Sequence, residues 1–194
     1  MTALYGPWDM RKREDRFPYD DTITYRFIGE WLDERGKIVE DWGCGGAWLS
    51  NEIVLGTYRG IDGAAAPWVF QQVDLRNYRS QVPRASMRHV LEHNYDWREV
   101  LTNFLASWSE RASIVTFVPF RGEFCKHKVC PGDEVEDLSV EVDHGKGEWA
   151  VPDLHLPRDE FLGRIEDSGA HVSWSGRYET DSQYGTEEVF HLSR

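Results

Sequence analysis

A short strand that runs straight into a glycine turn is the feature that most constrains this chain. Residues 37–41 read as a strand, Gly43, Gly45 and Gly46 follow at once, and residues 47–53 have the pattern of a helix that leaves the turn. Glycine lets main-chain amides approach a bound group, and a helix N-terminus adds a field that favours negative charge. The order strand, glycine turn, helix therefore predicts a ligand site, although the same local pattern also occurs in structural turns.

Strand and helix patterns alternate along the rest of the chain. Such alternation predicts a mostly parallel sheet that is covered by helices on both faces. We therefore expect an α/β fold, doubly wound, with a mostly parallel seven-stranded sheet and one antiparallel edge strand. The expected helices span residues 21–34, 47–53, 94–111 and 158–168, and the expected strands span residues 37–41, 57–62, 68–73, 82–89, 114–118, 171–178 and 187–192.

The composition excludes several classes of protein. The formal net charge of −12 disfavours general nucleic-acid binding, which needs clustered Lys and Arg. No apolar run approaches the ~20 residues that span a bilayer, and the N-terminus lacks the pattern of a signal peptide. Three cysteines are too few for a disulfide framework. We expect a cytoplasmic protein that does not bind membranes, and its oligomeric state stays open.

Acidic residues end two neighbouring predicted strands. Asp41 closes the strand before the glycine turn, and Asp62 closes the next strand along the chain. An acid at the end of that second strand is placed to bind both ribose hydroxyls of a nucleoside cofactor. The dinucleotide spacing G-x-G-x-x-G would need a third glycine where Trp48 stands, so an NAD-type oxidoreductase is disfavoured.

The run at residues 39–45 (VEDWGCG) instead resembles the first motif of class I S-adenosylmethionine-dependent methyltransferases, (D/E)-x-G-x-G. The resemblance continues in order over residues 37–118: residues 60–62 (GID) look like the second motif and residues 73–75 (VDL) like the third. Residues 90–93 (VLEH) are similar to the segment that follows the fourth strand in that family. The resemblance implies S-adenosylmethionine as cofactor and a Rossmann-like fold.

The resemblance also implies a set of site residues. Asp62 would hold the ribose, Asp74 would meet the adenine amino group, and Leu75 would cover the adenine ring. Arg88 and His89 would flank the cofactor through main-chain atoms, and Glu92 and His93 lie where the family brings the acceptor to the methyl group. Cofactor contacts are thus expected from Asp41, Gly43, Cys44, Gly45, Asp62, Gly63, Asp74, Leu75, Arg88 and His89.

Each of these assignments has a plainer alternative. Glu92 or His93 could serve only to cap or brace the next helix, and Cys44 is more typical of a small packing residue than of a nucleophile. Four aromatic residues before the first strand could close the site or only cover the core: Tyr5, Trp8, Tyr19 and Tyr25. Cys125, His127 and Cys130 could bind zinc, but their loose spacing favours a loop over the substrate with ordinary thiols, and we expect no metal.

The sequence therefore predicts one methyltransferase domain over residues 1–194. Within it we expect an N-terminal arm and helix (1–36), a cofactor-binding core (37–118), an insertion over the substrate (119–156) and a closing helix with antiparallel strands (157–194). The expected acceptor is a small molecule or a nucleotide-type compound. The alternative is a catalytically inactive subunit that keeps the fold and supports a partner.

Overall fold

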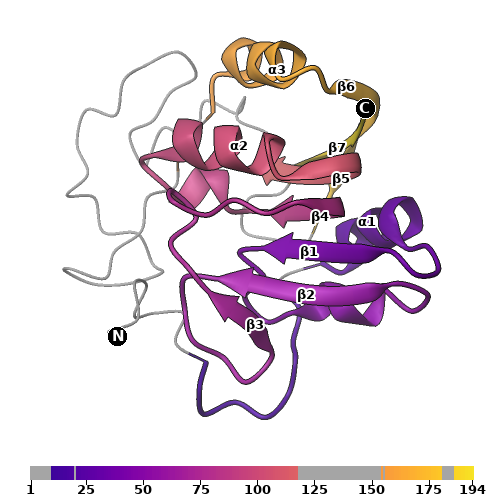
Figure 1. Cartoon of the computed structure of the whole chain (residues 1–194), viewed down its shortest axis with the longest axis vertical. Coiled ribbons are helices and arrows are strands. Elements are labelled where there is room, and N and C mark those ends of the chain that lie inside the picture. The colour runs from indigo at the N-terminus through magenta and orange to yellow at the C-terminus, as the bar shows by residue number, and fades with distance from the viewer. Residues whose placement is uncertain (1–9, 20, 118–153, 155, 181–185) are drawn as a thin grey trace.

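The computed structural model describes residues 10–19, 21–117, 154, 156–180 and 186–194. Seven strands form one sheet in the order β3-β2-β1-β4-β5-β7-β6 (Figure 1). The five strands from β3 to β5 pair in parallel, and β7 is antiparallel to both β5 and β6. The predicted sheet is therefore confirmed, with its antiparallel strand at the β6–β7 end. The bounds are β1 (Ile38–Trp42), β2 (Thr57–Asp62), β3 (Val69–Gln72), β4 (Val82–Arg88), β5 (Trp108–Phe117), β6 (His171–Glu179) and β7 (Thr186–Ser193).

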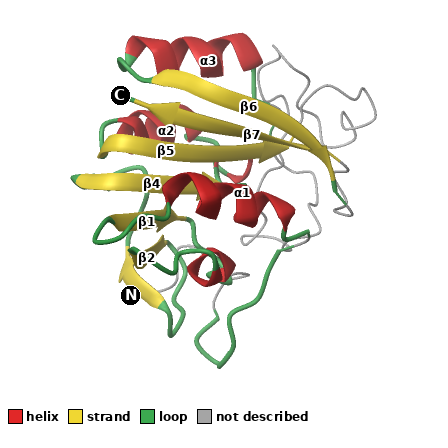
Figure 2. Ribbon diagram, turned by 90° about the vertical axis from the view of Figure 1, so that its right-hand side faces the viewer, coloured by secondary structure: helices red, strands yellow, loops and turns green. Residues whose placement is uncertain are grey.

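Helices cover the two faces of the sheet. Helix α1 (Ile23–Leu32) buries Tyr25, Ile28 and Leu32 against one face, together with apolar residues of β1, β5 and β7. Helices α2 (Trp97–Leu105) and α3 (Arg158–Asp167) bury a larger apolar cluster against the other face. Figure 2 shows α1 crossing the sheet on the side opposite to α2. Within the described residues, no helix is long and apolar enough to cross a membrane.

Strand β4 explains how a segment with few apolar residues becomes a central strand. Ala85 and Met87 point into the cluster beneath α2, and alternation places Arg84, Ser86 and Arg88 on the face toward α1. Arg84 donates a hydrogen bond to the Leu32 carbonyl oxygen at the end of α1 (2.7 Å). Arg88 donates to the Thr24 hydroxyl near the start of α1 (3.0 Å). Helix α1 thus supplies hydrogen-bond partners to both arginines on this buried polar face of β4.

The helix predicted over residues 47–53 is wrong. Only a short 3₁₀ helix, η2 (Trp48–Asn51), follows the glycine turn. Ala47 has a left-handed backbone (φ 54°), which an α-helix cannot contain. The Asp33 carboxylate then accepts hydrogen bonds from the amides of residues 54–56, and these long-range bonds hold the chain in an irregular turn.

The helix predicted over residues 94–111 is too long. Helix α2 ends at Leu105, and β5 begins at Trp108, so the strand expected at 114–118 is also longer than predicted. Trp108 is buried where β5 pairs with Val82 of β4. Residues 106–111 continue an amphipathic helical pattern, but pairing with β4 and β7 draws residues 108–111 into the sheet. The other predicted elements end within two residues of their observed bounds.

Two helical glycines provide a test of how closely α1 packs. A Cβ atom at Gly29 in α1 would lie 2.5 Å from the Glu52 Cβ and 2.9 Å from the Glu52 carbonyl oxygen. A Cβ atom at Gly163 in α3 would meet nothing within 4 Å. We expect Gly29→Ala to lower the free energy of unfolding by about 1–3 kcal/mol through overpacking. The matched change Gly163→Ala should raise it by about 0.5–1 kcal/mol.

Urea denaturation of the two single variants measures both effects. If the Gly29→Ala protein proves as stable as the Gly163→Ala protein, α1 does not pack against Glu52 as closely as the structure indicates.

Candidate functional site

The glycine turn is bound to the end of the neighbouring strand. Gly43 (φ 70°) and Gly45 (φ 47°) both have left-handed backbones that favour glycine. The amides of Gly43 and Cys44 donate to the Ile61 carbonyl oxygen at 2.7 and 3.2 Å. The turn therefore folds over the carboxyl end of β2, directly beside Asp62.

Asp62 and the glycine turn form one hydrogen-bonded unit. The Asp62 side chain is buried, its Oδ2 accepts from the Gly45 amide (2.8 Å), and its Oδ1 accepts from the Ala64 amide (2.7 Å). Burial raises the pKa of Asp62, and the amides of Ala64, Gly45 and Gly63 oppose that rise. The carboxylate is thus fixed in one orientation at the end of β2.

Asp41 is held by two hydroxyl groups. Ser86 of β4 donates to Asp41 Oδ1 (2.7 Å), and Tyr58 of β2 donates to Oδ2 (3.0 Å). Burial raises the pKa of Asp41 to about 6, and Asp62 adds to the rise, whereas Ser86, Tyr58 and Arg88 oppose it. Its ionisation therefore falls near neutral pH, in contrast to an ordinary aspartate.

The N-terminal arm, residues 10–19, lies across the glycine turn. The Phe17 amide donates to the Gly46 carbonyl oxygen (3.0 Å), and the Met10 amide donates to the Ala65 carbonyl oxygen (2.9 Å). A Cβ atom at Gly45 would lie 2.5 Å from the Tyr19 ring, and one at Gly46 would lie 2.1 Å from the Phe17 carbonyl oxygen. These two glycines thus give the arm its close approach. Of the four aromatic residues named above, Tyr5 and Trp8 lie outside the described residues, and Tyr19 lies at the turn.

Arg88 belongs to a buried ionic network at the end of β4. Its guanidinium donates to Glu187 of β7 (3.0 and 3.2 Å), to Thr24 (3.0 Å) and to the Tyr25 hydroxyl (3.2 Å). Thr24 also donates to Glu187 (2.8 Å). Burial alone would raise the pKa of Glu187, but His89 and Arg88 outweigh it and lower that pKa to about 2. The guanidinium is thus committed to the fold.

The turn after β4 carries the residues expected to face the acceptor. His89 has a left-handed backbone (φ 52°), and its ring stacks on Phe117 at a centroid distance of 3.9 Å. Its Nδ1 and Nε2 lie 3.4 Å from Glu92 Oε1 and 3.1 Å from Glu187 Oε1. Glu92 Oε1 also accepts from the Phe117 amide (2.7 Å). Glu92 therefore braces the end of β5 rather than the helix that follows.

His93 ends the 3₁₀ helix η3 (Leu91–His93), and its ring meets the edge of Phe117 at a centroid distance of 6.0 Å. It therefore lies on the same turn as Glu92.

Three further expected cofactor residues have other contacts. Asp74, after β3, binds the Arg76 side chain, which lowers the pKa of Asp74. Leu75 is buried in the apolar cluster beneath α2. Cys44 is buried in the turn, where a Cβ atom at Gly60 would lie 2.8 Å from its Sγ, and burial raises the pKa of its thiol. These properties fit the packing role for Cys44.

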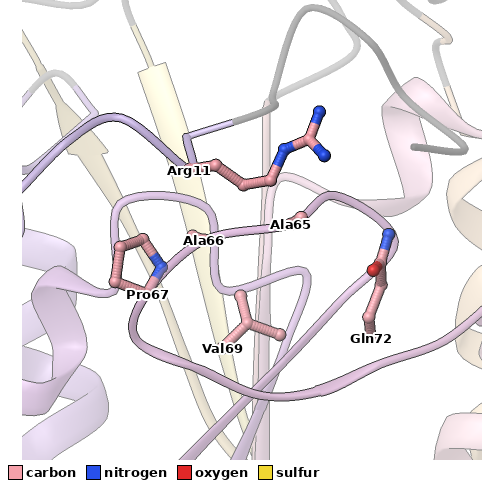
Figure 3. A pocket seen from close by; sticks show the side chains of 6 residues that line it. All are labelled: Arg11, Ala65, Ala66, Pro67, Val69 and Gln72. Atoms are coloured by element: carbon pink, nitrogen blue, oxygen red, sulfur yellow. The ribbon is translucent and has the colours of Figure 1, made fainter. Parts of the chain in front are cut away.

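A pocket of about 290 Å³ lies beside the loop that follows β2 (Figure 3). Figure 3 shows Arg11 of the arm above Ala65 and Ala66, with Gln72 at the far side. Gln72 donates to the carbonyl oxygen of Gly63, the residue after Asp62. None of the predicted cofactor residues lines this pocket, so the arm and the loop after β2 enclose space next to the expected site rather than within it. Its lining residues are Arg11, Ala65, Ala66, Pro67, Val69 and Gln72.

Some predictions fall outside the part of the chain that the structure describes. Cys125, His127 and Cys130 lie there, as do nearly all residues of the expected insertion at 119–156. Within the described ranges, no group of three His, Cys, Asp or Glu residues could hold a metal ion.

Sequence reasoning missed the residues that orient the site. Tyr58, Ser86, Thr24 and Glu187 all make side-chain hydrogen bonds to Asp41 or Arg88. A signal for Ser86 was present, because Ser86 and Arg88 alternate with Ala85 and Met87 as on a strand with a polar buried face. Glu187 is 99 positions from Arg88, and no local pattern joins them.

Comparison with known proteins identifies the fold. No protein-family model matches the sequence, and the curated proteins contain no significant match. Among solved structures, a methyltransferase from Methanosarcina mazei superimposes with a TM-score of 0.65 at 14% identity, over 93% of this chain and 98% of that chain. Magnesium protoporphyrin IX methyltransferase from Synechocystis, solved with bound S-adenosylhomocysteine, gives 0.61 at 16% identity over 88% and 82%.

A protein with a different named activity has the same architecture. The 4+2 cyclase SpnF gives a TM-score of 0.61 at 10% identity, over 96% of this chain and 86% of that chain. At such identities the shared property is the architecture, and the reaction depends on the residues of the site. The chain has the class I, Rossmann-like fold of S-adenosylmethionine-dependent methyltransferases.

Proposed function

We propose that this chain is an S-adenosylmethionine-dependent methyltransferase that acts on a small-molecule or nucleotide-type acceptor. The observation that carries the proposal is the Asp62 carboxylate, buried at the end of β2 and fixed by the amides of Gly45 and Ala64. The acid and the glycine turn are thus built as one unit at the carboxyl edge of the sheet, where open α/β sheets bind their ligands.

The residues at this edge fit the cofactor. A carboxylate can accept about four hydrogen bonds, so Asp62 keeps acceptor capacity for ribose hydroxyls beyond its amide bonds. Asp41 offers a second buried carboxylate on the same turn, suited to the ammonium group. Asp74 would bind the adenine amino group, and the main chain of Gly63, Arg88 and His89 would flank the nucleoside.

The bound cofactor supplies a methyl group on a sulfonium sulfur, so the main task of the protein is to position the acceptor against it. Glu92 and His93, on the turn after β4, are the side chains we assign to the acceptor. We further propose that residues 1–194 act as one domain, with the arm covering the glycine turn.

A second candidate is a catalytically inactive subunit with the same fold. The observation that favours it is the arm, because Phe17 and Tyr19 occupy the space directly over Gly46 and Gly45. A turn that serves only to anchor the arm would need the same glycines.

Calorimetry with S-adenosylmethionine, S-adenosylhomocysteine and NAD separates these functions. We expect micromolar binding of the first two and no binding of NAD. Asp62→Asn should weaken the binding of S-adenosylhomocysteine by at least about tenfold, because the change removes charge-assisted hydrogen bonds to the ribose. Asp33→Asn is the matched control, since Asp33 also accepts from main-chain amides but lies beyond the end of α1.

Asp33→Asn should lower stability and leave affinity unchanged. If neither nucleoside binds the wild-type protein, the inactive subunit becomes the better description.

The pKa of Asp41 predicts how pH changes the affinity. Ammonium binding needs the charged carboxylate, and the pKa of Asp41 is about 6. The affinity for S-adenosylhomocysteine should therefore fall about tenfold between pH 7 and pH 5. 5′-Methylthioadenosine lacks the ammonium group, so calorimetry should show no such fall for this ligand. Asp41→Asn should remove the dependence for the first ligand and change nothing for the second.

The stability of the ligand-free protein provides a separate check on Asp41. Its pKa is raised on folding, so the folded state binds the extra proton and loses stability as pH rises from about 4 to about 6. Asp41→Asn should therefore be more stabilising, relative to wild type, at pH 7 than at pH 4. Equal effects at both pH values would contradict the raised pKa.

A further inference from the structure

Among the described residues, none donates a hydrogen bond to Oε2 of the Glu92 carboxylate. The residue is buried with 1% of its surface exposed, and its Oε1 accepts from the Phe117 amide. Oε2 is fully buried and makes no hydrogen bond to any part of the chain that the structure describes. Most buried polar atoms in folded proteins have a partner, because desolvating one without compensation is costly. Oε2 is therefore placed to accept from a donor that the described residues do not supply.

The segment that carries Glu92 lies beside the site described above. The order of the strands reverses between β1 and β4, and ligands of doubly wound sheets bind at that point. The glycine turn follows β1, and residues 89–93 follow β4. The two segments touch, since a Cβ atom at Gly43 would lie 2.3 Å from the Val90 Cγ2. Glu92 is thus on the segment that faces the glycine turn across the switch point.

The charges around Glu92 decide what it can bind. Arg88 is fully engaged by Glu187, Thr24 and Tyr25. Among the described residues, His89 is the one group of potential positive charge within ion-pair distance of Glu92, and it also lies between Glu92 and Glu187. Arg88 neutralises Glu187, so Glu92 itself sets the charge beside Oε2, and an anion brought against it would be repelled. A group that carries its own N–H or O–H would instead satisfy Oε2.

We propose that Glu92 Oε2 accepts a hydrogen bond from the methyl acceptor, so that the acceptor is an amine or a hydroxyl compound and not a carboxylate or a phosphate. This assignment rests on the proposed methyltransferase function and narrows its substrate class. Oε1 remains bonded to the Phe117 amide and fixes the orientation of the carboxylate. His89, braced against Phe117, is a positioning residue for it.

Probe binding tests the assignment without knowledge of the natural acceptor. Benzylamine, benzyl alcohol and benzoate present an ammonium, a hydroxyl and a carboxylate on the same ring. We expect the wild-type protein to bind benzylamine or benzyl alcohol at least about tenfold more tightly than benzoate, in isothermal titrations with and without saturating S-adenosylhomocysteine. Glu92→Gln keeps a carbonyl oxygen for the Phe117 amide but turns the free position into a donor. This variant should therefore lose the preference for benzylamine or benzyl alcohol over benzoate.

The control is Glu110→Gln, which removes a carboxylate that binds Lys37 near the start of β5, at the opposite edge of the sheet. It should leave all three affinities within twofold of wild type. Thermal unfolding of both variants checks that they fold. Should Glu92→Gln fail to fold, the role of Glu92 is tested by comparing the probe preference of the wild-type protein with that of Glu92→Asp.

Three results overturn the assignment: benzoate binds as tightly as the donors, Glu92→Gln leaves the preference unchanged, or no probe binds at millimolar concentration. A wild-type protein that does not bind S-adenosylhomocysteine is a different outcome. It refutes the proposed function, whereas normal binding without the probe preference refutes the role of Glu92 alone.

Discussion

The polar face of strand β4 is the constraint on which the rest of the structure depends. Arg84, Ser86 and Arg88 lie in the middle of the sheet, and desolvating two guanidinium groups there is costly unless each is paired. Helix α1 and strand β7 meet that requirement, because α1 offers the Leu32 carbonyl oxygen and the Thr24 hydroxyl, and β7 offers Glu187. The helix, the antiparallel strand and the central strand are therefore fixed relative to one another by buried charges as well as by apolar contacts.

The same face of β4 orients the candidate site. Ser86 holds one oxygen of Asp41, and Tyr58 of β2 holds the other, so that the carboxylate before the glycine turn is fixed from both neighbouring strands. Glu187 lies against His89, whose left-handed backbone begins the turn toward Glu92. Groups held in this way need little reorganisation when a ligand arrives. The stability of the helix–sheet contact and the geometry of the site are thus properties of the same few residues.

Patterns in the sequence predicted those features of the fold that neighbouring residues determine. The strand at residues 57–62, its terminal Asp62 and the glycine turn follow from alternation and from glycine, and the structure has all three. The helix after the turn fails because Ala47 is left-handed and Asp33, far away in sequence, captures the amides of residues 54–56. Residues 108–111 leave the predicted helix because β4 pairs with them. The contacts that orient Asp41 and Arg88 join segments up to 99 positions apart, and periodicity carries no information about them.

The fold leaves the reaction open, since a structure named as a cyclase has the same architecture as those named as methyltransferases. The distribution of charge narrows the choice. Asp41 and Asp62 lie buried on the glycine side of the switch point, Glu92 and Glu187 lie buried on the other side, and Arg88 is already paired within the fold. Since Arg88 neutralises Glu187, three desolvated carboxylates remain, and such a site suits a sulfonium cation facing a neutral or cationic acceptor. It is poorly suited to bring together two negatively charged reactants, whose repulsion would be strongest in this buried region.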